Sequence, residues 1–70
     1  MSISEFTVTG MTCEHCERAV RSEVTAIPGV IDVAVSAESG QLRVTTEGEA
    51  VDAAAVLAAV DEAGYTAQPA

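Results

Sequence analysis

The sequence predicts an α+β domain in which a four-stranded antiparallel sheet carries two amphipathic helices on one face. Three observations lead to this fold class. The chain has 70 residues, which is enough for one small hydrophobic core. Its apolar periodicity changes from two residues to three or four, and back, twice along the chain. Segments that contain glycine or proline separate these stretches. We therefore expect residues 1–70 to form a single domain.

The first half of the chain predicts a strand, a helix and a second strand. Residues 5–10 alternate polar and apolar side chains, as is typical of a short strand. The apolar period then lengthens, so a helix is expected to begin near residue 13 or 14 and to end before Pro28. Residues 30–36 return to a period of two and predict the second strand. Its period-two apolar positions are Ile31, Val33 and Val35.

The second half repeats this pattern behind a hairpin. Residues 37–40 have the composition of a hairpin loop, and residues 41–47 predict the returning strand. Residues 48–64 predict the second helix, which ends at a glycine. Residues 65–68 are long enough only for a short edge strand. The buried stripe expected on the second helix consists of Ala53, Val56, Leu57 and Val60.

The predicted order β-α-β-β-α-β is that of the ferredoxin-like fold. In this arrangement the loop that precedes the first helix is expected to lie beside the loop that follows the second helix. Residues near position 12 and residues near position 65 should therefore be neighbours.

Composition excludes several classes of function. The formal net charge is −8, from eleven acidic residues against three arginines and no lysine. Nucleic acids and anionic membrane surfaces both require a basic patch, so neither is an expected partner. The longest apolar run, residues 53–60, is too short to span a membrane, and the first residues do not resemble a secretory signal. We expect a cytoplasmic protein that does not insert into membranes.

The two cysteines of the chain carry its most distinctive chemistry. Cys13 and Cys16 have the spacing C-x-x-C at the predicted start of the first helix. A helix N-terminus favours the thiolate over the thiol. Because cytosolic thiols are kept reduced, this spacing favours metal binding or redox chemistry over a structural disulfide. Cys16 is expected on the core-facing stripe and Cys13 in the loop, with Glu14 and His15 pointing outward between two converging sulfur atoms.

The small number of strong ligands favours a soft metal ion. Thiolates select Cu(I), whereas tetrahedral zinc usually requires four nitrogen or sulfur donors. Carboxylates could complete a zinc site, but the motif fixes none of them. A two-coordinate ion leaves positions open for a partner's thiolate, so such a site is suited to delivery.

The segment GMTCEHC resembles the signature of the heavy-metal-associated domain, of the bacterial copper chaperone type. The similarity continues in IPGV, SGQLRV and AGY, so it covers nearly the whole chain. The resemblance implies one Cu(I) ion per monomer, bound by Cys13 and Cys16. It also implies transfer of the ion to the metal-binding domain of a copper-transporting P-type ATPase, and no enzymatic activity.

Four further residues are expected to surround the ion without binding it. The resemblance places Met11 in the core beneath the loop and Tyr65 near the metal, and Thr12 takes the small-residue position of the signature. His15 is expected to face the solvent, and it would bind the ion only if two molecules share it. The exposed, unsaturated site is compatible with a copper-bridged homodimer.

Two alternatives remain open at the level of the sequence. Within metal binding, the chain could be a zinc-delivery or detoxification module, because relatives that bind mercury, zinc and cadmium share the signature. In another class, the pair could belong to a small thiol-disulfide oxidoreductase. The lysine-rich docking face of many family chaperones is absent here, so the docking electrostatics of those chaperones do not carry over.

Overall fold

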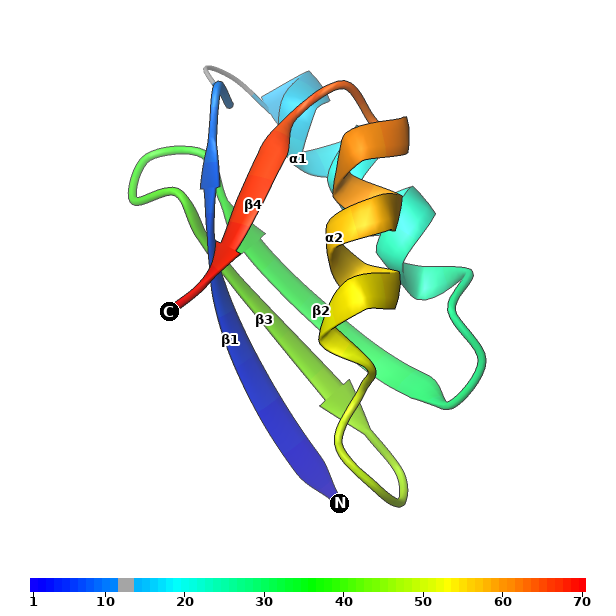
Figure 1. The fold of residues 1–70 in the computed structure, drawn as a ribbon. Coiled ribbons are helices and arrows are strands. Elements are labelled where there is room, and N and C mark those ends of the chain that lie inside the picture. The colour runs from blue at the N-terminus through cyan, green and yellow to red at the C-terminus, as the bar shows by residue number, and fades with distance from the viewer. Residues whose placement is uncertain (12–13) are drawn as a thin grey trace.

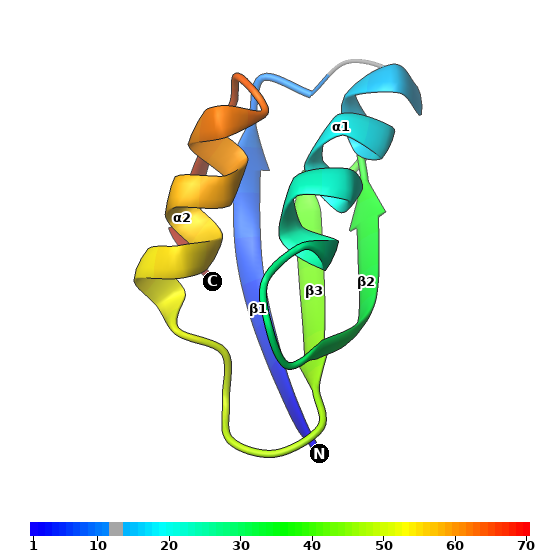
Figure 2. The same cartoon turned by 90° about the vertical axis from the view of Figure 1, so that its right-hand side faces the viewer.

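The computed structural model describes residues 1–11 and 14–70, and the predicted roles of Thr12 and Cys13 lie outside the described residues. The elements, in chain order, are β1 (Ser2–Thr9), α1 (Glu14–Thr25), β2 (Val30–Ser36), β3 (Gln41–Thr46), α2 (Ala53–Glu62) and β4 (Thr66–Pro69). The strands form one antiparallel sheet in the order β2-β3-β1-β4. Both helices cover the same face of this sheet (Figures 1 and 2). The ferredoxin-like fold predicted from the sequence is confirmed.

The core lies between the helices and the sheet and consists mainly of small aliphatic side chains. Val20 and Val24 of α1 and Val56 and Val60 of α2 are completely buried. Each pair is separated by four residues, which places both members on one face of their helix. The remaining buried apolar residues are Phe6, Val8, Met11, Cys16, Val33, Leu42 and Val44. Met11 and Cys16 thus belong to the core.

Strand β1 is longer than its sequence pattern predicts. It begins at Ser2, where the prediction began at residue 5, because Ser2 pairs with Thr46 in the ladder to β3. The Ser2 hydroxyl also donates a hydrogen bond to the Gly48 carbonyl, at 2.9 Å. The neighbouring strand supplies this pairing, so the polar residues at the start of the chain become part of the sheet.

Strand β2 contains an irregularity that corrects one prediction. The pairing with β3 shifts between Val30 and Asp32, so Ile31 is the extra residue of a β-bulge. A bulge shifts which side chains point to each face of the sheet. The period of two predicted that Ile31 faces the core as Val33 does, but Ile31 is 53% exposed. Val30, on the other side of the bulge, packs against the core instead.

Helix α2 begins at Ala53, five residues later than the predicted start. Asp52 caps it by accepting a hydrogen bond from the Ala54 N–H at 3.0 Å. Ala53 is exposed and therefore does not belong to the predicted buried stripe, whereas Leu57 is half-buried. Strand β4 extends to Pro69, which pairs with Phe6 at the edge of the sheet, where proline is tolerated.

Candidate metal-binding site

The end of β1 and the start of α1 lie at one end of the molecule, close to the loop between α2 and β4 (Figure 1). The chain turns out of the sheet at Gly10, whose φ of +93° is in the region that favours glycine. Met11 follows and is buried in the core. A glycine and a buried methionine therefore fix the direction in which the chain leaves β1.

Cys16 lies in the first turn of α1 and faces the interior. It is 8% exposed and belongs to the same buried cluster as Met11 and Val20. This confirms the prediction that Cys16 is on the core-facing stripe of the helix. The amide groups and dipole of a helix N-terminus stabilise negative charge in the first turn. Of the two predicted thiol ligands, Cys16 is the one that lies among the described residues.

Glu14 and His15 are both exposed, as predicted. Glu14 forms an ion pair with Arg18, one turn further along α1, with 3.0 Å between Oε1 and a guanidinium nitrogen. Both side chains of this pair are largely exposed, at 73% and 66%, so water screens their attraction. His15 faces solvent, where a second molecule can reach it.

Tyr65 lies where the predicted topology requires it. A Cβ atom built on Gly10 would be 3.4 Å from Cδ1 of Tyr65, so the aromatic ring lies against the backbone at the end of β1. Tyr65 is half-buried against the core, and its N–H donates to the Val60 carbonyl at 3.1 Å. Residues 55 positions apart in the sequence are thus adjacent, and the two loops are neighbours as expected.

Residues 5–66 match the heavy-metal-associated domain family. The chain belongs to this family. The copper chaperone CopZ of Staphylococcus saprophyticus is 32% identical over 65 residues, which cover 93% of this chain and 96% of CopZ. Copper-transporting ATPase 2 of Rhizobium meliloti is 40% identical over 62 residues, which cover 89% of this chain but 7% of the ATPase. A solved structure of the CopZ metallochaperone superposes on this chain with a TM-score of 0.87 and is 33% identical in sequence. The superposition covers 96% of this chain and all of that one.

The sequence did not predict that Glu17 links α1 to the turn between β2 and β3. Its carboxylate, directly after Cys16, accepts a hydrogen bond from the backbone N–H of Ala37 at 2.6 Å. In the sequence, Glu17 has only the signature of an acidic residue in a helix's first turn. A contact between residues 20 positions apart leaves no periodic signal, so no local pattern could have found it.

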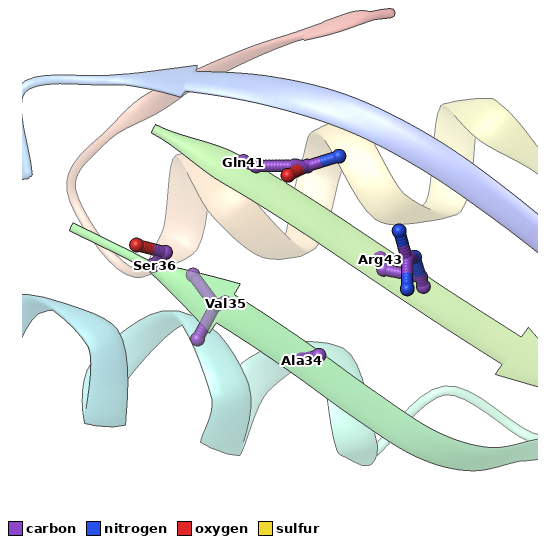
Figure 3. Close-up of a pocket in the computed structure, with 5 residues that line it drawn as sticks. All are labelled: Ala34, Val35, Ser36, Gln41 and Arg43. Carbon is purple, nitrogen blue, oxygen red and sulfur yellow. The ribbon is translucent and has the colours of Figure 1, made fainter. Parts of the chain in front are cut away.

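The described residues contain no group of three or more His, Cys, Asp and Glu side chains that could hold a metal ion. A hollow of about 170 Å³ lies elsewhere, over strands β2 and β3 (Figure 3). Its lining consists of Ala34, Val35, Ser36, Gln41 and Arg43. Gln41 and Arg43 both donate to Glu5 of β1, at 2.6 and 3.3 Å. This lining includes no sulfur or imidazole donor, so the hollow is not suited to a soft metal.

In the described part of the chain, no helix has the length and apolar character needed to cross a membrane.

Proposed function

We propose that this protein is a copper chaperone that binds one Cu(I) ion through Cys13 and Cys16. In this proposal it transfers the ion to the metal-binding domain of a copper-transporting P-type ATPase. The observation that carries the proposal is the burial of Cys16, in the first turn of α1, within the same core cluster as Met11. Similarity over nearly the full length of a copper chaperone, and to part of a copper-transporting ATPase, supports the choice of ion and of partner.

The proposed transfer is a ligand exchange. A thiolate of the partner enters an open coordination position of the bound Cu(I), and the ion is then three-coordinate. One of the two thiolates of this chain dissociates and the second follows, so the ion leaves without a change in oxidation state. Because Cys16 is held in the core, we propose that Cys13 is the first to exchange.

The residues around Cys16 fit this role. Met11 belongs to the same apolar cluster as the Cys16 thiol, and the ring of Tyr65 lies against the backbone at Gly10. This chemistry transforms no substrate, so the proposed protein is not an enzyme. The proposed place of the exchange is the cytoplasm.

The experiment that tests the proposal compares Cu(I) with Zn²⁺. Anaerobic titrations against a competing chelator are made with the wild type and with the double variant Cys13→Ser/Cys16→Ser. The core variant Val24→Ala serves as a control for lost stability, because it removes buried volume and leaves both thiols. We expect the wild type and Val24→Ala to retain Cu(I) far more strongly than Zn²⁺, and the double variant to retain neither.

Two outcomes would contradict the proposal. Comparable retention of both ions by the wild type would favour a zinc or general soft-metal module. Efficient turnover of a disulfide substrate, lost when either cysteine is replaced, would favour a thiol-disulfide oxidoreductase.

A copper-bridged homodimer is a further part of the proposal. A second copy can supply the thiolate that a partner would otherwise supply, and the exposed His15 lies next to the same position. Native mass spectrometry at half an equivalent of Cu(I) should show a dimer that carries one ion. The replacement His15→Ala should leave the dimer intact if only thiolates bridge the ion.

A further inference from the structure

We infer that Glu17 is a positioning residue for the metal site, because it fastens the β2–β3 turn to the chain directly after the cysteine pair. This inference rests on the proposed function. It assigns a role in metal retention to a carboxylate that does not touch the ion.

The β2–β3 turn, residues 37–40, is fixed to the chain on both sides of the cysteine pair. Before the pair, the N–H of Val8 in β1 donates to the Gly40 carbonyl at 2.6 Å. After the pair, the N–H of Ala37 donates to the Glu17 carboxylate at 2.6 Å. The two anchors are at opposite ends of one short turn. The turn therefore ties together the two ends of the segment that runs from residue 9 to residue 16.

Internal hydrogen bonds and close packing fix the conformation of the β2–β3 turn. We call residues 37–40, together with their hydrogen bonds to Val8 and Glu17, the brace. The Gly40 N–H donates to the Ser36 carbonyl at 2.8 Å, and the Gln41 N–H donates to the Ser39 hydroxyl at 3.3 Å. Gly40 has a φ of +73°, and a Cβ atom there would be only 2.9 Å from the Val8 carbonyl oxygen. The turn thus lies in direct contact with the end of β1 (Figure 1).

Glu17 differs from its neighbour Glu14, although both are acidic residues in the first turn of α1. Glu14 is exposed and pairs with Arg18 on its own helix. Glu17 is half-buried and reaches another element of the fold. A hydrogen bond from an amide to an ionised carboxylate is stronger than one between neutral groups, especially when it is shielded from water. Glu17 is therefore a structural link, whereas Glu14 is a solvated surface charge.

The consequence for the metal is preorganisation. A bis-thiolate site holds an ion tightly when its sulfur atoms are kept in a fixed geometry, and the Glu17–Ala37 link restrains the first turn of α1, which carries Cys16. Loss of the Glu17–Ala37 link should therefore weaken Cu(I) binding without removing a ligand.

The test uses three variants of the full chain. Glu17→Ala removes the acceptor, Glu17→Gln keeps an acceptor oxygen without the charge, and Glu23→Ala removes an exposed acid of the same helix. Cu(I) affinity is measured by anaerobic competition with a chelator. We expect Glu17→Ala to lose about three- to tenfold in affinity, and Glu17→Gln to lose less because it keeps a weaker, neutral hydrogen bond. Glu23→Ala should stay within about twofold of the wild type.

A second measurement detects the brace itself and needs no metal. Amide hydrogen exchange of the metal-free protein should be fastest at Ala37 in Glu17→Ala, with protection between that variant and the wild type in Glu17→Gln. Urea denaturation confirms that each variant is folded under the conditions of the titration.

Several results would overturn the inference. Wild-type affinity in Glu17→Ala would show that the brace does not position the site. Equal losses in Glu17→Ala and Glu17→Gln would assign the effect to charge rather than to the hydrogen bond. Unchanged exchange at Ala37 would show that the link does not hold in solution. If the proposed function is wrong, the wild type itself will fail to retain Cu(I). Hydrogen exchange at Ala37 tests the brace independently of that outcome.

Discussion

The chain passes from a strand to a helix twice, and the two junctions differ in chemistry. The junction between β3 and α2 is satisfied by its own side chains, since Asp52 caps α2 and the Thr46 hydroxyl donates to the Glu49 carbonyl at 2.7 Å. The junction between β1 and α1 places a thiol and a thioether against the core, at Cys16 and Met11. Figure 1 shows that the two junctions are at opposite ends of the sheet.

This difference shows how the fold separates stability from function. Both helix N-termini offer unpaired N–H groups and a positive electrostatic potential. At α2 a carboxylate of the chain occupies that position, and the result is structural. At α1 the first turn carries Cys16, and in the proposed function its thiolate uses the same potential. The type of side chain, and not the topology, therefore decides which junction has a chemical role.

The largest expected effect is on Cu(I) affinity, when serine replaces one residue at each junction in two separate variants. Cys16→Ser should lower Cu(I) affinity by at least about a hundredfold, because one of the two proposed soft ligands becomes a hard hydroxyl. Asp52→Ser should leave the affinity unchanged, because serine is also a good helix cap. Competition with a chelator under anaerobic conditions measures both. Retention of Cu(I) by Cys16→Ser would remove the proposed distinction between the junctions.

The next effect concerns backbone strain at the two ends of the molecule. Gly40→Ala should lower the free energy of unfolding by about 2–4 kcal/mol, because it adds a contact with the Val8 carbonyl to an unfavourable positive φ. Gly29→Ala is the matched control. Gly29 also has a positive φ, of +90°, but a Cβ atom there would meet nothing within 4 Å. It should lose only about 1 kcal/mol. Urea denaturation measures both, and equal losses would contradict the role of the close approach.

A smaller effect is expected from removing the helix cap. Asp52→Ala should lower the free energy of unfolding by about 1 kcal/mol, because the Ala54 N–H loses its acceptor. Cu(I) affinity should not change, since the cap is at the opposite end of the sheet. Asp61→Ala is the control within the same helix. It removes an acidic residue from the last turn of α2 and should be neutral or slightly stabilising. A change in metal affinity in Asp52→Ala would show that the two junctions are coupled.

The smallest effect should come from the ion pair between Glu14 and Arg18. Arg18→Gln should change the free energy of unfolding by less than about 0.5 kcal/mol, because the pair is exposed to solvent and screened by salt. Urea denaturation at low and high salt provides the measurement. A loss above about 1 kcal/mol would mean that this pair contributes to holding the first turn of α1.

Residues with a strong local or topological signal were predicted correctly. The burial of Cys16 follows from the helical period that it shares with Val20 and Val24. The proximity of Tyr65 to Gly10 follows from the ferredoxin-like order of elements. The helical period places Cys16, and the order of the elements places Tyr65, which lies between α2 and β4. Both signals can be read from the sequence alone.

Features that depend on non-local pairing could not be predicted. The bulge at Ile31 arises from the register between β2 and β3, and an alternating pattern alone gives no sign of it. The start of α2 depends on Asp52, although Glu49, Ala50 and Val51 before it are compatible with a longer helix. The hydrogen bond from Ala37 to Glu17 requires the packed positions of α1 and the β2–β3 turn.

The course of β1 has a practical consequence. This eight-residue strand is about 25 Å long, and it begins next to Met1 and ends next to Gly10. The N-terminus therefore lies at the end of the sheet that is remote from the start of α1 (Figure 1). Molecules immobilised through their N-terminus on a sensor surface should all present the Gly10 end to the solution. The proposed exchange of an ion with a soluble partner can then be followed in real time without the surface blocking the encounter.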